Sequence, residues 1–281
     1  MKVEELYIIG ERINASIPRV DAMLEAGDFP AIVDLALEQA RDGAREIDLN
    51  VGIRSVEVMV EMIRTVQAKV NLPLSIDSDD PEKLRQGLRI AGESGTGRIT
   101  PLLNSVTQAR AGELLPLRRE HPCRVVLLLS ERTENGRIRS NGTAEQALET
   151  AVELARQARE HGFAPEEIWF DPGLPPIAGD LEGLLSVVLE VLEGINTPEF
   201  EGTHRLVGIS NLTHHLPSPI RLPLQNAFLT LAVESGLDTI IGNPAREYRT
   251  LPDDDPTLDA VRRILEAEGA ERLTILQELY Q

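Results

Sequence analysis

EIDLNVG (46–52) and LPLSIDS (72–78) are two apolar segments that end in polar residues, and residues 55–69 between them have the length of a helix. Nearly continuous apolar runs are typical of parallel strands that are covered on both faces. Parallel strands need a long crossover connection, which is usually a helix. The two segments therefore predict a strand–helix–strand unit in which polar residues follow each strand.

The same pattern recurs along the whole chain. Six further apolar runs end at or near Asp, Asn or Glu, and they are YIIGERIN (7–14), ITPLLNS (99–105), VVLLLSE (125–131), IWFDPG (168–173), LVGISN (206–211) and TIIGNP (239–244). Helices are expected over residues 30–43, 55–69, 81–94, 107–120, 143–161, 181–194, 221–235 and 256–268. Eight such units predict an α/β fold, a (β/α)8 TIM barrel that forms a single domain over residues 1–281. Residues 131–142 and 211–220 would be long loops over the mouth of the barrel.

The composition narrows the classes of function. The 28 Lys and Arg residues against 46 Asp and Glu residues give a net charge of -18, which argues against nucleic acid as a partner. Cys123 is the only cysteine, which excludes an intrachain disulfide and a zinc site built from several cysteines. The first residues lack a signal-peptide pattern, and no apolar run approaches the roughly 20 residues that span a membrane. We therefore expect a cytoplasmic protein that is not bound to a membrane.

The carboxyl ends of the strands in such a barrel meet at one mouth, where catalytic groups lie. The sequence places a ring of polar residues there, namely Asp48, Asn50, Asp77, Asn104, Asp171, Asn211 and Asn243. Carboxylates in a partly buried mouth need hydrogen-bond donors to offset their lost hydration. The pyrimidine edge of a pterin ring has several adjacent N–H donors, which Asp and Asn side chains can match.

Several of these residues also have a plain structural interpretation. Asp77 could cap the following helix, although Asp79 and Asp80 could do so in its place, and Asn104 is of a type common in turns. For Asp171 the capping role is less expected, because a Pro-Gly pair follows it.

Other motifs give little sign of a different chemistry. His214 and His215 are adjacent, but a metal site would need further ligands, so a solvated pair is the simpler interpretation. GxGxxG, GxxxxGK[ST] and GxSxG are absent, so the sequence gives no dinucleotide, phosphate-loop or nucleophile-elbow signal.

Seven ordered segments resemble one known family. They are GERIN (10–14), IDLNVG (47–52), LSIDS (74–78), LLNS (102–105), WFDPG (169–173), GISN (208–211) and NAFLTLAVESGLD (226–238). They look like the pterin-binding methyltransferases, that is, the methyltetrahydrofolate:corrinoid protein methyltransferases, which are related to the folate module of cobalamin-dependent methionine synthase. Each segment is short, but the ordered set is specific and spans nearly the whole barrel. The chain departs from the family after GISN, where LTHHLPSP (212–219) replaces a loop that is often rich in Gln or Asn.

The resemblance implies a set of site residues. The pterin ring would lie in a pocket formed by Asn50, Asp77, Asn104, Asp171, Ser210 and Asn211. Asn211 would be the catalytic residue, because it would reach the ring nitrogen that carries the methyl group. Arg12, His214 and Arg221 are candidates for contacts with the tail of the ligand or with a partner, and no metal site is expected.

The resemblance also implies the reaction. A methyl group would move between 5-methyltetrahydrofolate, or a related reduced pterin, and the cobalt of a cobalamin-type corrinoid on a separate corrinoid protein. The family usually forms homodimers. The reduced cobalt is itself the nucleophile, which agrees with the missing nucleophile motif, and catalysis would consist mainly of positioning and electrostatic stabilisation.

Three alternatives stay open. The pterin could be tetrahydromethanopterin, whose ring would contact the same residues. A dihydropteroate synthase would share the barrel and the pterin pocket, but residues 211–220 contain no Lys or Arg for the pyrophosphate that this enzyme displaces. A non-catalytic pterin-binding subunit would keep Asp77 and Asp171 without needing Asn211.

Overall fold

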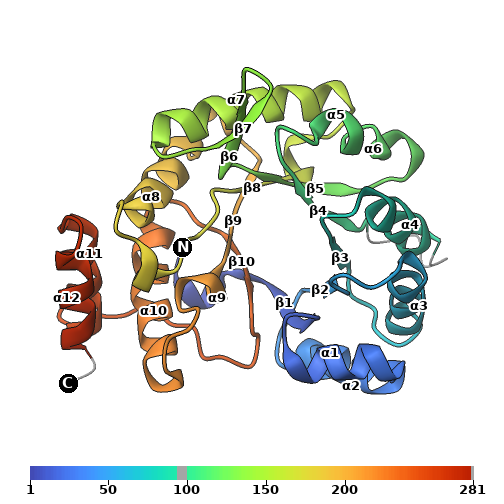
Figure 1. The fold of residues 1–281 in the computed structure, drawn as a ribbon, viewed down its shortest axis with the longest axis horizontal. Coiled ribbons are helices and arrows are strands. Elements are labelled where there is room, and N and C mark those ends of the chain that lie inside the picture. Colours follow the sequence, from blue (N-terminus) through green and yellow to red (C-terminus); the bar gives the residue numbers. More distant parts are fainter. Residues whose placement is uncertain (94–99, 280–281) are drawn as a thin grey trace.

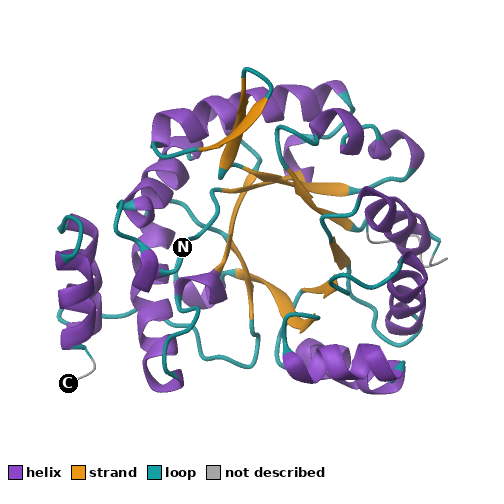
Figure 2. Cartoon of the chain, viewed as in Figure 1, coloured by secondary structure: helices purple, strands orange, loops and turns teal. Residues whose placement is uncertain are grey.

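Eight parallel strands form a closed barrel in the computed structural model, which describes residues 1–93 and 100–279. The strands are β1 (Tyr7–Asn14), β2 (Glu46–Asn50), β3 (Leu74–Asp77), β4 (Leu102–Val106), β5 (Arg124–Leu128), β8 (Ile168–Asp171), β9 (His204–Gly208) and β10 (Thr239–Gly242). They pair in this order, and β10 pairs with β1 to close the ring (Figures 1 and 2). The predicted fold class, a (β/α)8 barrel, is confirmed.

The helices form an outer layer around the strands (Figure 2). The longer ones are α2 (Phe29–Arg41), α3 (Val56–Gln67), α4 (Pro81–Gly92), α7 (Ala144–Glu160), α8 (Leu184–Ile195), α10 (Ser218–Glu234) and α11 (Pro256–Glu266). These match seven of the expected helices to within a few residues. Residue 94, the expected end of one helix, and residue 99, the expected start of one strand, lie outside the described residues.

Apolar residues of five strands fill the inside of the barrel. Ile9, Leu102, Val126, Trp169 and Leu206 form one cluster, separate from those between the strands and the helices. Side chains two residues apart on a strand point to the same face. The residues two positions after four members of this cluster are Glu11, Asn104, Asp171 and Gly208. Three of these four residues have polar side chains, so polar groups lie directly above the apolar layer, at the carboxyl ends of the strands.

The segment expected as one helix over residues 107–120 consists of two short helices. They are α5 (Ala111–Leu114) and α6 (Leu117–Glu120). Pro116 lies between them and has no N–H for a helical hydrogen bond, which explains the break. The prediction of one continuous helix was wrong.

The segment 131–142, expected as a loop, contains a β-hairpin. Strand β6 (Glu131–Glu134) pairs antiparallel with β7 (Arg137–Ser140). The two residues between the strands, Asn135 and Gly136, have φ values of 51° and 73°. Positive φ at both central positions is the geometry of a type I′ turn, for which Asn-Gly is the preferred pair.

Within the described residues, three further α-helices were not expected from the sequence. They are α1 (Pro18–Ala26), α9 (Ile209–Leu212) and α12 (Glu271–Glu278). Helix α9 lies within the segment expected to be the end of a strand and a long loop. Among the described residues, no helix has the length and apolar character that crossing a membrane would require.

Candidate active site

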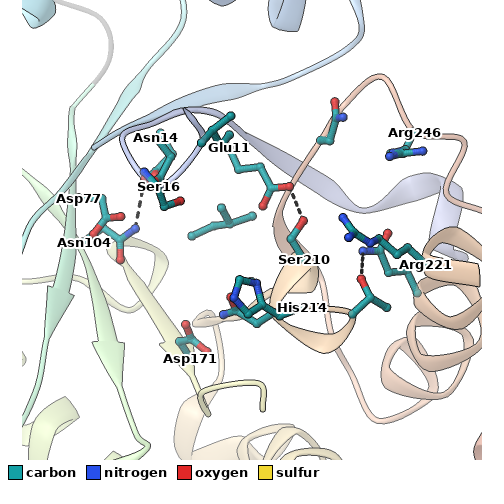
Figure 3. A pocket seen from close by; sticks show the side chains of 18 of the residues that line it. Glu11, Asn14, Ser16, Asp77, Asn104, Asp171, Ser210, His214, Arg221 and Arg246 are labelled. Carbon is teal, nitrogen blue, oxygen red and sulfur yellow. Dashed lines mark hydrogen bonds between the residues drawn. The ribbon is translucent and has the colours of Figure 1, made fainter. Parts of the chain in front are cut away.

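A cavity of about 550 Å³ opens at the carboxyl ends of the barrel strands. Residues of β2, β3, β4 and β8 line one part of it, and residues of β1, α9 and the segment after β10 line another. Figure 3 shows Asp77, Asn104 and Asp171 on one side, with Glu11, Ser210, Arg221 and Arg246 on the other. Most of the polar residues proposed from the sequence line this cavity, namely Asp48, Asp77, Asn104, Asp171, Ser210, Asn211, His214, Arg221 and Asn243.

Asp77 is held by a neighbouring strand. The Asn50 side-chain nitrogen donates to Asp77 Oδ2 at 2.8 Å, and Asn50 Oδ1 accepts from the Gly52 backbone nitrogen at 2.7 Å. Both the nitrogen and the oxygen of the Asn50 amide are therefore hydrogen-bonded within the protein, and Asn50 is not among the residues that line the cavity, although we expected it there. No other described side chain donates to Asp77, so its second carboxylate oxygen is open to a ligand. Burial raises the pKa of Asp77, and the hydrogen bond from Asn50 partly offsets this.

The capping interpretation does not apply to Asp77. Helix α4 begins after Asp80, whose side chain accepts from the Glu82 backbone nitrogen at 2.9 Å. Asp80 supplies the cap, so Asp77 is left for the cavity.

Asn104 is oriented by a buried acid. Its side-chain nitrogen donates to Asp48 Oδ1 at 3.2 Å, and the Ser75 hydroxyl donates to the same oxygen at 2.6 Å. The amide nitrogen of Asn104 is directed at Asp48, which leaves its oxygen as the free acceptor. Asp48 is 2% exposed, and burial together with the nearby charge of Asp77 raises its pKa well above the ordinary value.

Asp171 ends β8 and begins a turn. Its Oδ1 accepts from the Gly173 backbone nitrogen at 2.8 Å, and no other described residue donates to this side chain. Burial raises the pKa of Asp171 to about 6, and the bond from Gly173 limits the rise. Asp171 therefore has one oxygen held by the turn and one open to a ligand.

Asp77, Asn104 and Asp171 thus present three acceptor oxygens that no described protein group satisfies. Partly buried acceptors of this kind favour a ligand that brings N–H donors, because a polar group that loses water without gaining a partner costs free energy. The protein holds each of the three side chains through its other atom, so the acceptors are oriented before a ligand arrives.

The opposite side of the cavity contains an acid that sequence reasoning missed. Glu11 of β1 accepts a hydrogen bond from the Ser210 hydroxyl of α9 (Figure 3). Burial raises its pKa to about 7, while the bond from Ser210 and the charge of Arg246 act in the opposite direction. The sequence signal was a pair of charged residues, Glu11 and Arg12, within the segment of β1.

Asn211 lies on α9 beside Ser210 rather than at the end of a strand. Its side-chain nitrogen is 3.1 Å from the point that a Cβ atom on Gly208 would occupy. A larger residue at position 208 would therefore push against the Asn211 amide, so Gly208 gives this side chain its room.

The remaining candidates are placed differently. Arg221 lines the cavity, and its Nε donates to the Leu216 backbone oxygen at 2.6 Å. His214 also lines the cavity, with its ring 4.0 Å from that of His215 between centroids. Arg12 does not line it, because its guanidinium pairs with Glu38 at 2.8 Å and with Asp42 at 3.6 Å, both of the outer layer.

In the described part of the chain, no group of three or more His, Cys, Asp or Glu side chains is placed so that it could hold a metal ion.

Two known proteins are similar to this chain over more than four fifths of its length. The methylcorrinoid:tetrahydrofolate methyltransferase of Eubacterium limosum is 30% identical over 244 residues, which cover 85% of each chain. The methionine synthase of Mycobacterium tuberculosis is 30% identical over 254 residues, 84% of this chain but only 20% of that protein. The chain thus spans about a fifth of the length of that relative.

The solved structures agree at the level of fold. The dihydropteroate synthase from Xanthomonas albilineans, in complex with 7,8-dihydropteroate, has a TM-score of 0.60 at 19% identity and covers 100% of this chain and 95% of its own. At that identity the likeness shows a shared fold only. Residues 7–243, nearly the whole barrel, match the family described as pterin binding enzyme, and with the relative from Eubacterium limosum this shows that the chain belongs to the pterin-binding enzyme family.

Proposed function

We propose that the protein is a methyltransferase that moves a methyl group between a methylated reduced folate and the cobalt of a corrinoid on a partner protein. The observation that carries the proposal is the set of three open acceptor oxygens on Asp77, Asn104 and Asp171. The relative from Eubacterium limosum, whose name pairs a methylcorrinoid with tetrahydrofolate, supplies the reaction.

The three acceptors would bind the pyrimidine edge of the pterin. This edge carries an amino group and ring N–H groups, so each acceptor would receive one hydrogen bond from a donor in a site with little water. Hydrogen bonds to an ionised carboxylate are stronger than those between neutral groups. The ionised forms of Asp77 and Asp171 are therefore the forms that bind.

Asn211 would act on the ring nitrogen that carries the methyl group. As the N–CH3 bond breaks, its electron pair stays on nitrogen, and the cobalt supplies the pair for the new Co–C bond. An amide that lies beside this nitrogen can donate to it as its electron density grows, without being a strong acid. Such a contact contributes most in the transition state, where the change in charge is under way.

The corrinoid partner has to approach from the open side of the cavity. Among the described residues, an apolar layer that includes Ile9 and Trp169 fills the barrel below the cavity, so the methyl group and a second protein would meet at the mouth. The homodimeric state and the cytoplasmic location stay predictions.

The test is a titration with 5-methyltetrahydrofolate, followed by mixing with reduced free cobalamin while the cobalt spectrum is recorded. Binding followed by formation of methylcobalamin supports the proposal. Binding without transfer, both to free cobalamin and to corrinoid proteins of the same source, contradicts the methyl transfer and favours a non-catalytic pterin subunit. Absence of binding contradicts the pterin site.

Two parallel assays separate the alternatives. A titration with methyltetrahydromethanopterin in place of the folate identifies the preferred pterin. Incubation with the pyrophosphate ester of hydroxymethyl-dihydropterin and p-aminobenzoate tests dihydropteroate synthesis. We expect no dihydropteroate, because residues 211–220 contain no Lys or Arg for the pyrophosphate that a dihydropteroate synthase displaces.

A further inference from the structure

Glu11 joins two parts of the mouth that are far apart in the sequence. Its carboxylate, on β1, accepts the hydroxyl hydrogen of Ser210 on α9, and both side chains line the cavity. Ser210 immediately precedes Asn211, the residue proposed to reach the reacting nitrogen. Figure 3 shows Glu11 and Ser210 pointing toward one another on the side of the cavity that lies away from Asp77 and Asn104. Glu11 is therefore not one of the acceptors for the pyrimidine edge.

The surroundings of Glu11 allow both of its protonation states. Burial favours the neutral acid and raises its pKa to about 7. The Ser210 hydroxyl and the positive charge of Arg246 favour the carboxylate. Tyr248 is the other titratable group that interacts with it, and the charge of Glu11 contributes to the raised pKa of this phenol. A group balanced in this way can release and take up a proton near neutral pH, which suits general acid–base catalysis.

We propose that Glu11, acting through the Ser210 hydroxyl, is the proton donor to the pterin ring nitrogen when the methyl group leaves, and the acceptor of that proton in the reverse direction. This assignment rests on the proposed methyl transfer and deepens it. The acceptor oxygens of Asp77, Asn104 and Asp171 on the other wall would be occupied in binding the pyrimidine edge.

The step balances without a further reactant. The bond between the ring nitrogen and the methyl carbon breaks, and its electron pair stays on nitrogen. When Glu11 is neutral, its carboxyl hydrogen is donated to the Ser210 oxygen, the reverse of the bond that the carboxylate accepts. The Ser210 hydroxyl then turns its own hydrogen toward the ring nitrogen, gives that proton to the nitrogen and receives the proton of Glu11. The methyl group is bound by the electron pair of the reduced cobalt, which is thereby oxidised from Co(I) to Co(III). Glu11 ends as a carboxylate, which the hydroxyl of Ser210 and the charge of Arg246 stabilise.

Glu11→Gln is the direct test because it keeps an acceptor for the Ser210 hydroxyl and removes the exchangeable proton. Single-turnover transfer from saturating 5-methyltetrahydrofolate to reduced cobalamin is measured between about pH 5.5 and 8.5. For the wild type we expect the rate to fall as the pH rises through about 7, by up to about tenfold for each pH unit. For Glu11→Gln we expect a rate about 100-fold lower at pH 6, loss of this pH dependence, and an affinity for the pterin within about threefold of the wild type.

Ser210→Ala tests the route of the proton. It removes the hydroxyl that lowers the pKa of Glu11, so the residual rate should be slower and its fall should move to higher pH. Glu247→Gln is the matched control, since this exposed residue is next to Arg246 in sequence, loses the same charge and does not line the cavity. Its rate and pH profile should equal those of the wild type.

The outcomes distinguish the two proposals. If the wild type transfers the methyl group and Glu11→Gln keeps its rate and pH profile, the assignment of Glu11 is overturned and the methyl transfer stands. If Glu11→Gln binds the pterin weakly but retains the pH dependence, Glu11 is a binding residue and the assignment is also overturned. A wild type that binds the pterin but transfers no methyl group overturns both.

Discussion

Asp171→Asn removes one negative charge from the candidate site while keeping the shape of the side chain. The Asn oxygen can still accept from the Gly173 backbone nitrogen, as Asp171 Oδ1 does at 2.8 Å. An amino group then takes the place of the oxygen that is open to the ligand. The substitution should therefore leave the turn intact and change only the electrostatics and the ligand contact.

The stability effect follows from the pKa of the carboxyl. Burial raises it from 3.8 to about 6, and each unit corresponds to about 1.4 kcal/mol. Because the folded-state pKa lies above the unfolded one, the stability that proton binding contributes is present below about pH 4 and is lost as the pH rises through 6. At pH 7 the wild type bears the full cost of the buried charge. The variant should then be more stable, by up to about 3 kcal/mol, and this gain should shrink toward pH 4.

The binding effect has the opposite sign. A hydrogen bond to a charged group contributes about 1.5–3 kcal/mol, so the variant should bind the pterin about 10- to 150-fold more weakly. Urea unfolding at several pH values and calorimetric titration at pH 7 measure the two effects. Asp254→Asn, an exposed position outside the cavity, is the control and should change neither. A variant that is no more stable at pH 7 than the wild type, or that binds the pterin equally well, would refute the reasoning.

Three further substitutions test other parts of the structure. Asn211→Ala should lower the rate of methyl transfer more than the affinity for the pterin, and equal losses in the two measurements would point to plain binding. Asn50→Ala should weaken pterin binding by about 1 kcal/mol, because it frees the Asp77 carboxylate from its 2.8 Å bond; calorimetry that finds unchanged affinity would show that this bond orients nothing. Asp180→Ala should lower the free energy of unfolding by about 3–5 kcal/mol, since Asp180 is 3% exposed and pairs with buried Arg272 at 3.2 Å. Its effect should appear in urea unfolding, with pterin affinity of the folded protein preserved, and a loss below about 1 kcal/mol would contradict the buried pair's role.

The sequence predicted the barrel because each strand shows a local pattern, an apolar run with a polar residue at or near its end. The runs around Asp48 and Asp77 are apolar, end in polar residues and are separated by one helix length, and β2 and β3 occupy them. A closed barrel brings the ends of all its strands together, so the fold itself placed Asp77, Asn104 and Asp171 at one cavity. Their common location therefore required no knowledge of side-chain contacts.

The sequence pattern could not predict which of these polar residues line the cavity and which ones orient their neighbours. Asn50 and Asp77 each end an apolar run in the sequence. In the structure Asp77 lines the cavity, whereas Asn50 donates to Asp77 and orients it. This contact depends on the register between β2 and β3, which the sequence does not show. Glu11 was missed because it stands beside another charged residue, Arg12, and the sequence gives no sign of its burial, which depends on α9 and the segment after β10.

Two local features were missed although the sequence held a signal for each. Asn135-Gly136 is the preferred pair for a type I′ hairpin turn, and Pro116 marks a break within an expected helix. For Arg12, by contrast, the sequence suggested a ligand contact that the structure does not show. An arginine beside a mouth residue was a reasonable candidate for ligand contact, but neighbouring side chains alternate in direction along a strand, and Arg12 faces α2.

The most direct test of the central claim is to follow the methyl group itself. The protein is mixed with 5-methyltetrahydrofolate labelled with carbon-13 in the methyl group and with reduced cobalamin, and the label is observed by NMR. We predict that the signal of the nitrogen-bound methyl group is replaced by that of a cobalt-bound one, and that this occurs much more slowly with Asn211→Ala. A label that stays on the pterin in the presence of reduced cobalamin and of corrinoid proteins would contradict the assignment as a methyltransferase.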